Sequence, residues 1–115
     1  MVNEGSEWKR NDDILQRNNN GNMYMEYTKF IYNKTHAEAI VKVKSLQSIV
    51  EGADIKIGNI SSSKFYPKIV AKDVSYTGST IGAIYINGDS INYRHLKGTM
   101  PENYVTCFYI RWELF

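Results

Sequence analysis

Cysteine, proline and histidine are scarce in this chain of 115 residues, and each scarcity excludes a class of chemistry. The single cysteine, Cys107, excludes an internal disulfide and a zinc site built from several cysteines. It lies in a stretch typical of a strand, where we expect a buried structural thiol. Neither of the two prolines precedes a cysteine, which removes a further metal-binding signature.

Long apolar runs and a strong net charge are also missing. No run approaches the roughly 18 apolar residues that a membrane-spanning helix needs, so we expect no membrane contact. The first residues show no apolar core of a signal peptide, which favours a cytoplasmic location. The net charge of +2 is too small to indicate a nucleic-acid binder by itself.

Motifs for catalysis and cofactor binding are absent as well. His36 and Glu38 match half of the zinc deaminase signature, but no Pro-Cys-x-x-Cys segment completes the metal site. The sequence has no phosphate-binding P-loop, no dinucleotide fingerprint and no Gly-x-Ser-x-Gly elbow. We therefore expect neither metal nor cofactor, and a binding role is favoured over an enzymatic one.

What the chain does contain is a hairpin signal at Asn87-Gly88, flanked by two alternating apolar segments. This dipeptide can supply the two positive φ angles of a type I′ turn, whose twist suits a two-residue hairpin loop. In the resulting register, Ile84 faces Ile91. These isoleucines and Tyr93 are then predicted to lie on the core side of the sheet.

Residues 36–51 are predicted to form the main helix. Thr35 and Glu38 have the spacing of an N-terminal capping box, and Gly52 would follow the last turn as the C-terminal cap. At 100° per residue, one apolar stripe forms that would pack on a sheet. The stripe comprises Ala39, Val43, Leu46 and Val50, flanked by Ile40 and Ile49, with Val41 as an exception on the outer face.

Six segments are typical of strands, because they alternate in polarity or are rich in β-branched and aromatic residues. They cover residues 23–32, 54–60, 65–76, 81–86, 89–96 and 104–114. One helix among about five to six strands predicts an α+β fold, a mostly antiparallel sheet with the helix on one face. The polar residues 1–22 are expected to form an N-terminal arm, flexible or with a short helix, ahead of a single α+β domain over residues 23–115.

The outer face of the predicted hairpin is the leading candidate for ligand recognition. Tyr85, Asn92 and Arg94 share that face and combine aromatic, amide and guanidinium groups, a composition suited to binding. Arg111 on the last strand is the fourth candidate. A solvated sheet face without a function is the alternative interpretation of the same residues.

Two further hypotheses concern nucleic acids. Lysine and tyrosine alternate along residues 65–76, and such a face can stack single-stranded bases while its lysines neutralise phosphate. The residues concerned are Tyr66, Lys68, Lys72 and Tyr76, although lysine on an edge strand also protects against aggregation. In the second hypothesis, His36 and His95 serve as acid and base of a small metal-independent nuclease.

The last strand indicates a partner. It is apolar or aromatic on both faces while one helix is available to cover it, so a homodimer or a host protein on the sheet face is expected. Abundant Ile, Asn, Lys and Tyr reflect A/T-rich codons, which are typical of low-GC bacteria and their phages. The leading hypothesis is a small non-catalytic binding protein for a protein or nucleotide-containing ligand, such as a phage or mobile-element inhibitor of a host system. A structural subunit of a larger assembly is the remaining class.

Overall fold

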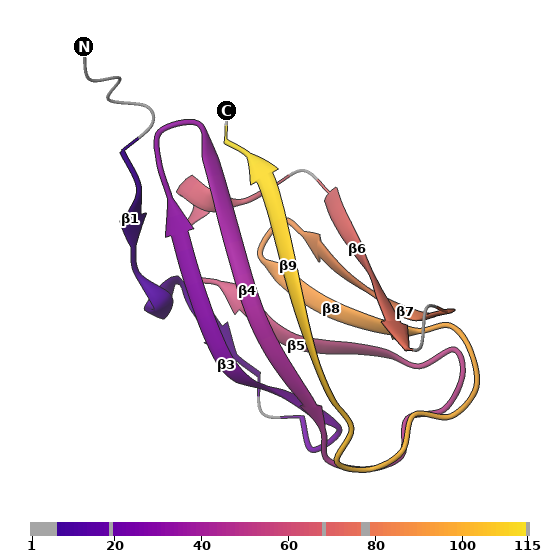
Figure 1. The fold of residues 1–115 in the computed structure, drawn as a ribbon. Coiled ribbons are helices and arrows are strands. Elements are labelled where there is room, and N and C mark those ends of the chain that lie inside the picture. Colours follow the sequence, from indigo (N-terminus) through magenta and orange to yellow (C-terminus); the bar gives the residue numbers. More distant parts are fainter. Residues whose placement is uncertain (1–6, 19, 68, 77–78, 115) are drawn as a thin grey trace.

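The structure is a computed structural model that describes residues 7–18, 20–67, 69–76 and 79–114, without the side chains of residues 69, 72–76 and 79. The described residues form nine strands in two sheets that stack face to face (Figure 1). All paired strands run antiparallel, which confirms the predicted strand direction. The molecule is therefore a β-sandwich, with principal extents of 51 × 29 × 22 Å.

Each sheet mixes strands from distant parts of the chain. Sheet A has the order β1-β3-β4-β9, and sheet B has the order β2-β5-β8-β7-β6. Sheet A contains β1 (Lys9–Arg10), β3 (Met23–Tyr32), β4 (His36–Ser45) and β9 (Val105–Glu113). Sheet B contains β2 (Leu15–Arg17), β5 (Asp54–Ile60), β6 (Ile69–Tyr76), β7 (Ser79–Asn87) and β8 (Ser90–His95). Two short 3₁₀ turns, η2 (Asp12–Ile14) and η3 (Ser63–Phe65), complete the described elements.

The predicted α+β class and its helix over residues 36–51 are wrong. No helix of seven or more residues occurs in the described chain, and β4 buries every second side chain. Val41, the exception to the helical stripe, is 1% exposed, whereas Leu46 and Val50 of that stripe are 40% and 63% exposed. The apolar residues of this segment are therefore buried with the period of two of a strand and not with the period of 3.6 of a helix, and their β-branched side chains favour the strand. The described chain also has no helix whose length and apolarity would allow it to cross a membrane.

Of the apparent capping box, Thr35 lies in the turn between β3 and β4, and Glu38 lies in β4 itself. The side-chain oxygen of Asn33 accepts hydrogen bonds from the backbone N–H groups of Thr35 and His36, at 2.9 and 2.8 Å. Asn side chains bond the backbone in this way in turns as readily as at helix starts. Gly52, expected as a helix cap, instead has a φ of +88° in the turn that precedes β5.

Of the N-terminal arm predicted for residues 1–22, residues 7–18 and 20–22 are described, and their strands belong to the sandwich. β1 pairs with β3 of sheet A, and β2 pairs with β5 of sheet B. η2 connects these two strands, and Leu15 directly after it is 4% exposed in the core. The chain therefore passes from one sheet to the other at this edge of the sandwich.

Aromatic side chains connect the two layers inside the sandwich. Trp112 on β9 donates its indole N–H to the carbonyl oxygen of Phe65 at 2.9 Å. Phe30 on β3 packs edge-on against the Phe65 ring, with 5.1 Å between the centroids. Such contacts bury large apolar areas and fix ring orientation, so they hold sheet A against the segment that leads into β6. The largest buried side chains include Met23, Met25, Phe30, Ile57, Ile60, Ile84, Ile86, Ile91 and Tyr93.

Candidate functional site

The β7–β8 hairpin sorts its side chains as predicted, but the chain turns one residue later. Its inward isoleucines and Tyr93 are at most 1% exposed, which confirms the predicted core side. The loop residues are Gly88 and Asp89, because Asn87 is already paired with Ser90. Gly88 has a φ of +61° at the first central position, the pattern of a type II′ turn. The predicted type I′ turn at Asn87-Gly88 is therefore wrong.

Tyr85, Asn92 and Arg94 lie together on the outer face of sheet B. Tyr85 pairs with Asn92, and Arg94 pairs with Asp54 on β5. The Tyr85 hydroxyl donates to the Asp54 carboxylate, 2.8 Å from Oδ1 and 2.7 Å from Oδ2. This hydrogen bond is the main reason that the pKa of Tyr85 is raised. The structure thus brings three of the four predicted binding residues together and adds a carboxylate, Asp54, to the group.

Arg111 lies on the opposite side of the sandwich, on the outer face of sheet A. Its Nη1 is 3.4 Å from Oε1 of Glu38, and its guanidinium carbon lies 5.8 Å from the ring centroid of Trp8. Glu38 also raises the pKa of Tyr109, chiefly by accepting a hydrogen bond from the phenol hydroxyl. Arg111 is therefore grouped with two aromatic side chains and is separated from Tyr85 by both sheets.

Exposed aromatic side chains share the outer face of sheet A with Arg111, and two of them, Trp8 and Tyr109, lie next to it. Trp8, Tyr27 and Tyr109 are 41%, 47% and 43% exposed. We name the surface formed by Trp8, Tyr27, Tyr109 and Arg111 the aromatic face. Single exposed apolar side chains are normal on a protein surface, whereas several large ones on one face are informative about binding. The aromatic face therefore combines large exposed rings with a guanidinium group.

The strand register explains why two of these tyrosines are neighbours. Tyr27 on β3 faces Lys42 on β4, and Tyr109 on β9 faces Ile40 on β4. Lys42 and Ile40 are two residues apart on the same side of β4, so Tyr27 and Tyr109 lie in successive cross-strand rows. With strand spacing and rise of ordinary size, their Cα atoms are about 12 Å apart. A single ligand or partner can therefore contact both rings.

β9 was expected to be apolar on both faces, and the two faces differ in the structure. Three of its inward side chains are buried and Thr106 is half-buried, whereas its outward side chains, Cys107 among them, are exposed. The predicted buried thiol is wrong, because Cys107 points away from the core on the alternating strand. The inward residues are Phe108, Ile110 and Trp112, and the outward residues include Val105, Cys107 and Tyr109.

Most of the predicted nucleic-acid face lies outside the described residues. Lys68 is one of these positions, and so are the side chains of Lys72 and Tyr76. Tyr66 is described, precedes β6 and is 40% exposed. The backbone of β6 forms an edge of sheet B, where lysine side chains commonly hinder the addition of another strand.

The two histidines of the nuclease hypothesis lie at opposite ends of the sandwich. His36 is the first residue of β4, while His95 is buried and lines a cavity of about 240 Å³ together with Pro101 and Tyr104. Pro101 and Tyr104 are hydrogen-bonded through their backbones to Ser45, the last residue of β4. Ten strand residues, or about 30 Å, therefore separate the two histidines. An acid and a base this far apart cannot act on one phosphate.

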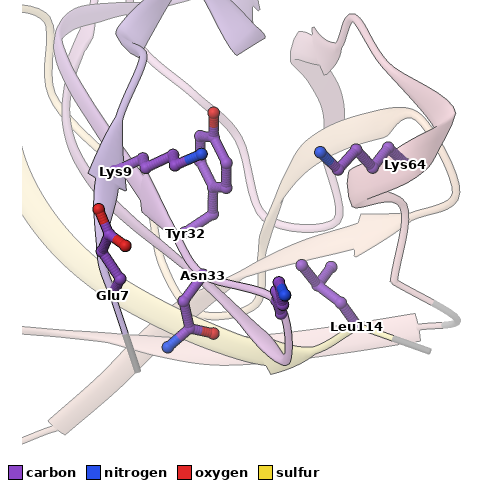
Figure 2. A pocket seen from close by; sticks show the side chains of 7 residues that line it. Glu7, Lys9, Tyr32, Asn33, Lys64 and Leu114 are labelled. Carbon is purple, nitrogen blue, oxygen red and sulfur yellow. The ribbon is translucent and has the colours of Figure 1, made fainter. Parts of the chain in front are cut away.

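A second cavity lies where β3 turns into β4, and no sequence pattern predicts it (Figure 2). Its volume is about 440 Å³, and three lysines from separate segments line it. They are Lys9 of β1, Lys34 of the β3–β4 turn and Lys64 of η3. We name it the lysine cavity. Local motifs could not reveal it, because the fold brings together positions far apart in the chain.

No protein-family model matches this chain, and neither the curated proteins nor the solved structures contain a match to it. Within the described residues, no three His, Cys, Asp or Glu side chains come together in a group suited to a metal ion. The aromatic face and the lysine cavity are therefore the features from which we infer a function.

Proposed function

We propose that this chain is a small non-catalytic binding module that docks a protein partner through the aromatic face of sheet A. The observation that carries the proposal is that exposed Trp8 and Tyr109 lie beside Arg111, with exposed Tyr27 on the same outer face of sheet A. Tryptophan, tyrosine and arginine are the residue types that dominate the binding energy of protein interfaces. Contiguous exposed apolar groups with a polar surround also mark such interfaces.

The aromatic face is held in place before any partner arrives. The carboxylate of Glu38 contacts both Arg111 and Tyr109, and the Glu38 side chain is only 14% exposed. Glu38 lies on β4, which is paired with a strand on each side, and Tyr109 and Arg111 lie on β9, which is paired with β4. A preorganised surface loses less conformational entropy on binding, so more of its contact energy appears as affinity.

Paired charges favour a protein over a nucleic acid at this surface. A nucleic-acid site needs uncompensated positive charge to neutralise phosphates. On the outer side of sheet A, three cations have a carboxylate within ion-pair distance, while no ion pair joins Lys29 or Lys44 of the same face to a described carboxylate. The pairs are Arg10 with Asp12 at 2.9 Å, Lys42 with Glu26 at 3.4 Å, and Arg111 with Glu38 at 3.4 Å.

A pair of double variants tests this proposal. Trp8→Ala/Tyr109→Ala removes two rings from the aromatic face, and Tyr66→Ala/Tyr85→Ala removes two partly exposed rings elsewhere as the matched control. Analytical ultracentrifugation over a concentration series asks first whether the partner is a second copy of the chain. A dimer that the face variant loses and the control keeps supports self-association, and larger species would indicate a subunit of an assembly.

If the protein sediments as a monomer, cross-linking of tagged protein in its source cells addresses a different partner. The proposal expects a protein that is captured by the wild type and by the control but is lost with the face variant. Equal behaviour of the two double variants in both experiments would contradict it. The expectations of a phage or mobile-element origin and of an inhibitory role stay predictions, since the geometry of the face does not bear on them.

A further inference from the structure

We propose that the lysine cavity binds a small ligand that carries phosphate groups and a flat ring, such as a nucleoside triphosphate. This site differs from the aromatic face, and its occupancy does not depend on a protein partner. It lies at the end of the sandwich where β1, the β3–β4 turn and η3 come together.

Charge is the first argument. Lys9 and Lys64 each contribute a positive charge to the lining, and Glu7 contributes one negative charge. Within the described chain, no ion pair joins Lys9 or Lys64 to a carboxylate. Like charges gathered in one hollow repel each other, and a bound anion relieves that repulsion. Lysine acts toward phosphate as a compact point charge, so an array of ammonium groups suits a polyphosphate.

The arrangement of the lysines is the second argument. Figure 2 shows Lys9 and Lys64 reaching from opposite walls toward the space between them. Ammonium groups on facing walls can contact different oxygens of one extended anion that lies between them. The volume of about 440 Å³ lies within the range of about 300–1,000 Å³ that is typical of small-molecule sites.

An aromatic wall is the third argument, because it distinguishes a nucleotide from a simple anion. The Tyr32 ring lines the cavity, and the rings of Phe30 and Phe65 pack against it with centroids 6.0 and 4.6 Å away. These neighbours hold the Tyr32 ring in one orientation, and Leu114 adds an apolar side chain to the lining. A fixed aromatic ring is a surface on which a base can stack.

The contact of Lys64 with the rings places its charge at the cavity. Its Nζ lies 5.7 Å from the ring centroid of Tyr32 and 5.4 Å from that of Phe65, within the range of a cation–π interaction. The ammonium group is therefore held beside the aromatic wall. A ligand with a base and a phosphate chain can meet the ring and the charge together.

Isothermal titration calorimetry at low ionic strength tests the proposal with three probes: ATP, inorganic tripolyphosphate and adenosine. We expect ATP to bind more tightly than tripolyphosphate, and adenosine to bind more weakly than either. Lys9→Ala/Lys64→Ala should weaken ATP binding by roughly tenfold or more, since each lost charge-assisted hydrogen bond contributes substantially. Tyr32→Leu should reduce the advantage of ATP over tripolyphosphate.

The matched control is Lys44→Ala/Lys56→Ala, which removes the same charge from the outer faces of the two sheets. It should bind ATP as the wild type does, and unchanged thermal unfolding shows that each variant is folded. If both double variants lose ATP binding equally, the interaction is nonspecific and the proposal is wrong. Tripolyphosphate binding as tight as ATP binding would overturn the nucleotide assignment, and absence of ATP binding to the wild type would overturn the site.

Discussion

The hydroxyl oxygen of Tyr93 lies 2.8 Å from Nδ1 of His95, and the two side chains are 0% and 1% exposed. Burial raises the pKa of Tyr93 to about 12, so the hydroxyl keeps its proton at neutral pH and can donate it to Nδ1. Nε2 of His95 has no hydrogen-bond partner in the described structure. The Tyr93 hydroxyl therefore provides the hydrogen bond that the buried imidazole makes within the described structure.

Removing that hydroxyl is expected to destabilise the fold. Tyr93→Phe leaves both ring nitrogens of His95 buried without a partner, which should lower the free energy of unfolding by about 1–3 kcal/mol. Tyr85→Phe deletes the same atom on the outer face of the same hairpin and should cost less than about 1 kcal/mol. Urea denaturation of the two variants measures the difference, and equal losses would contradict the assigned role of the buried bond.

Gly82 is predicted to tolerate no side chain, because Tyr93 fills the space beside it. A Cβ on Gly82 would overlap the Tyr93 hydroxyl and would lie 2.7 Å from the carbonyl oxygen of Arg94. Gly82→Ala should therefore lower the free energy of unfolding by roughly 1–3 kcal/mol or more, the cost of overpacking a core. The matched control is Ala83→Ser, which adds one atom to the neighbouring side chain on the outer face. This change should alter the free energy of unfolding by no more than about 0.5 kcal/mol. Thermal unfolding with similar midpoints for both variants would show that the backbone shifts freely here.

The hairpin shows how far a local pattern determines structure. Alternating polarity predicted the inward side chains correctly, because a strand presents successive residues to opposite faces. The turn was placed one residue too early, since Asn87, Gly88 and Asp89 offer two overlapping glycine turns. Moving the turn by one residue changes the partner of each strand residue by two positions, so that Ile84 faces Tyr93 and not Ile91. A shift of two positions leaves every side chain on its predicted face.

The wrong helix has a different origin. The apolar residues of segment 36–45 alternate with the period of two of a strand, and they also begin a stripe with the period of 3.6 of a helix. The local sequence does not decide between strand and helix. Long-range pairing decides, because β4 lies between β3 and β9 and receives hydrogen bonds from both sides. β9 is about seventy residues away along the chain, beyond the reach of any local signal.

Two valines provide a test of strand against helix in this segment. Val41→Ala should lower the free energy of unfolding by about 1–3 kcal/mol, since Val41 is 1% exposed in the core. Val50→Ala should have an effect within about 0.5 kcal/mol, because Val50 is 63% exposed. A helix over residues 36–51 would reverse the order. Chemical denaturation of the two variants therefore distinguishes the two structures.

The candidate sites depend even more on distant contacts than the fold does. Arg111 was proposed as a partner of Tyr85, yet strand order places the two residues on opposite faces of the sandwich. Trp8 meets Arg111 although 103 positions separate them, as 111 − 8 = 103. Composition could indicate that tyrosine and arginine serve recognition, but which of them share a surface follows from topology alone.

Acid should weaken the attachment of the N-terminal strand through Asp12. Its Oδ1 accepts hydrogen bonds from Nε of Arg10 at 3.0 Å and from the backbone N–H of Phe30 at 2.9 Å. The bond from Arg10 is the main reason that the pKa of Asp12 is lowered. A carboxyl whose folded pKa lies below its unfolded value contributes stability above the unfolded pKa, near 3.9, and loses it as the pH falls through the folded pKa.

Wild-type protein should therefore lose more stability between pH 7 and pH 3 than Asp12→Asn, which carries no ionisable group at this position. Asp13→Asn is the matched control, because the Asp13 side chain accepts no hydrogen bond from the described residues and its removal should leave the acid dependence unchanged. Urea midpoints measured across this pH range give the comparison. If the Asp12→Asn and wild-type curves stay parallel down to pH 3, the contact between Asp12 and Arg10 contributes nothing to the stability of the sandwich, and the ordering of β1 must come from its pairing with β3.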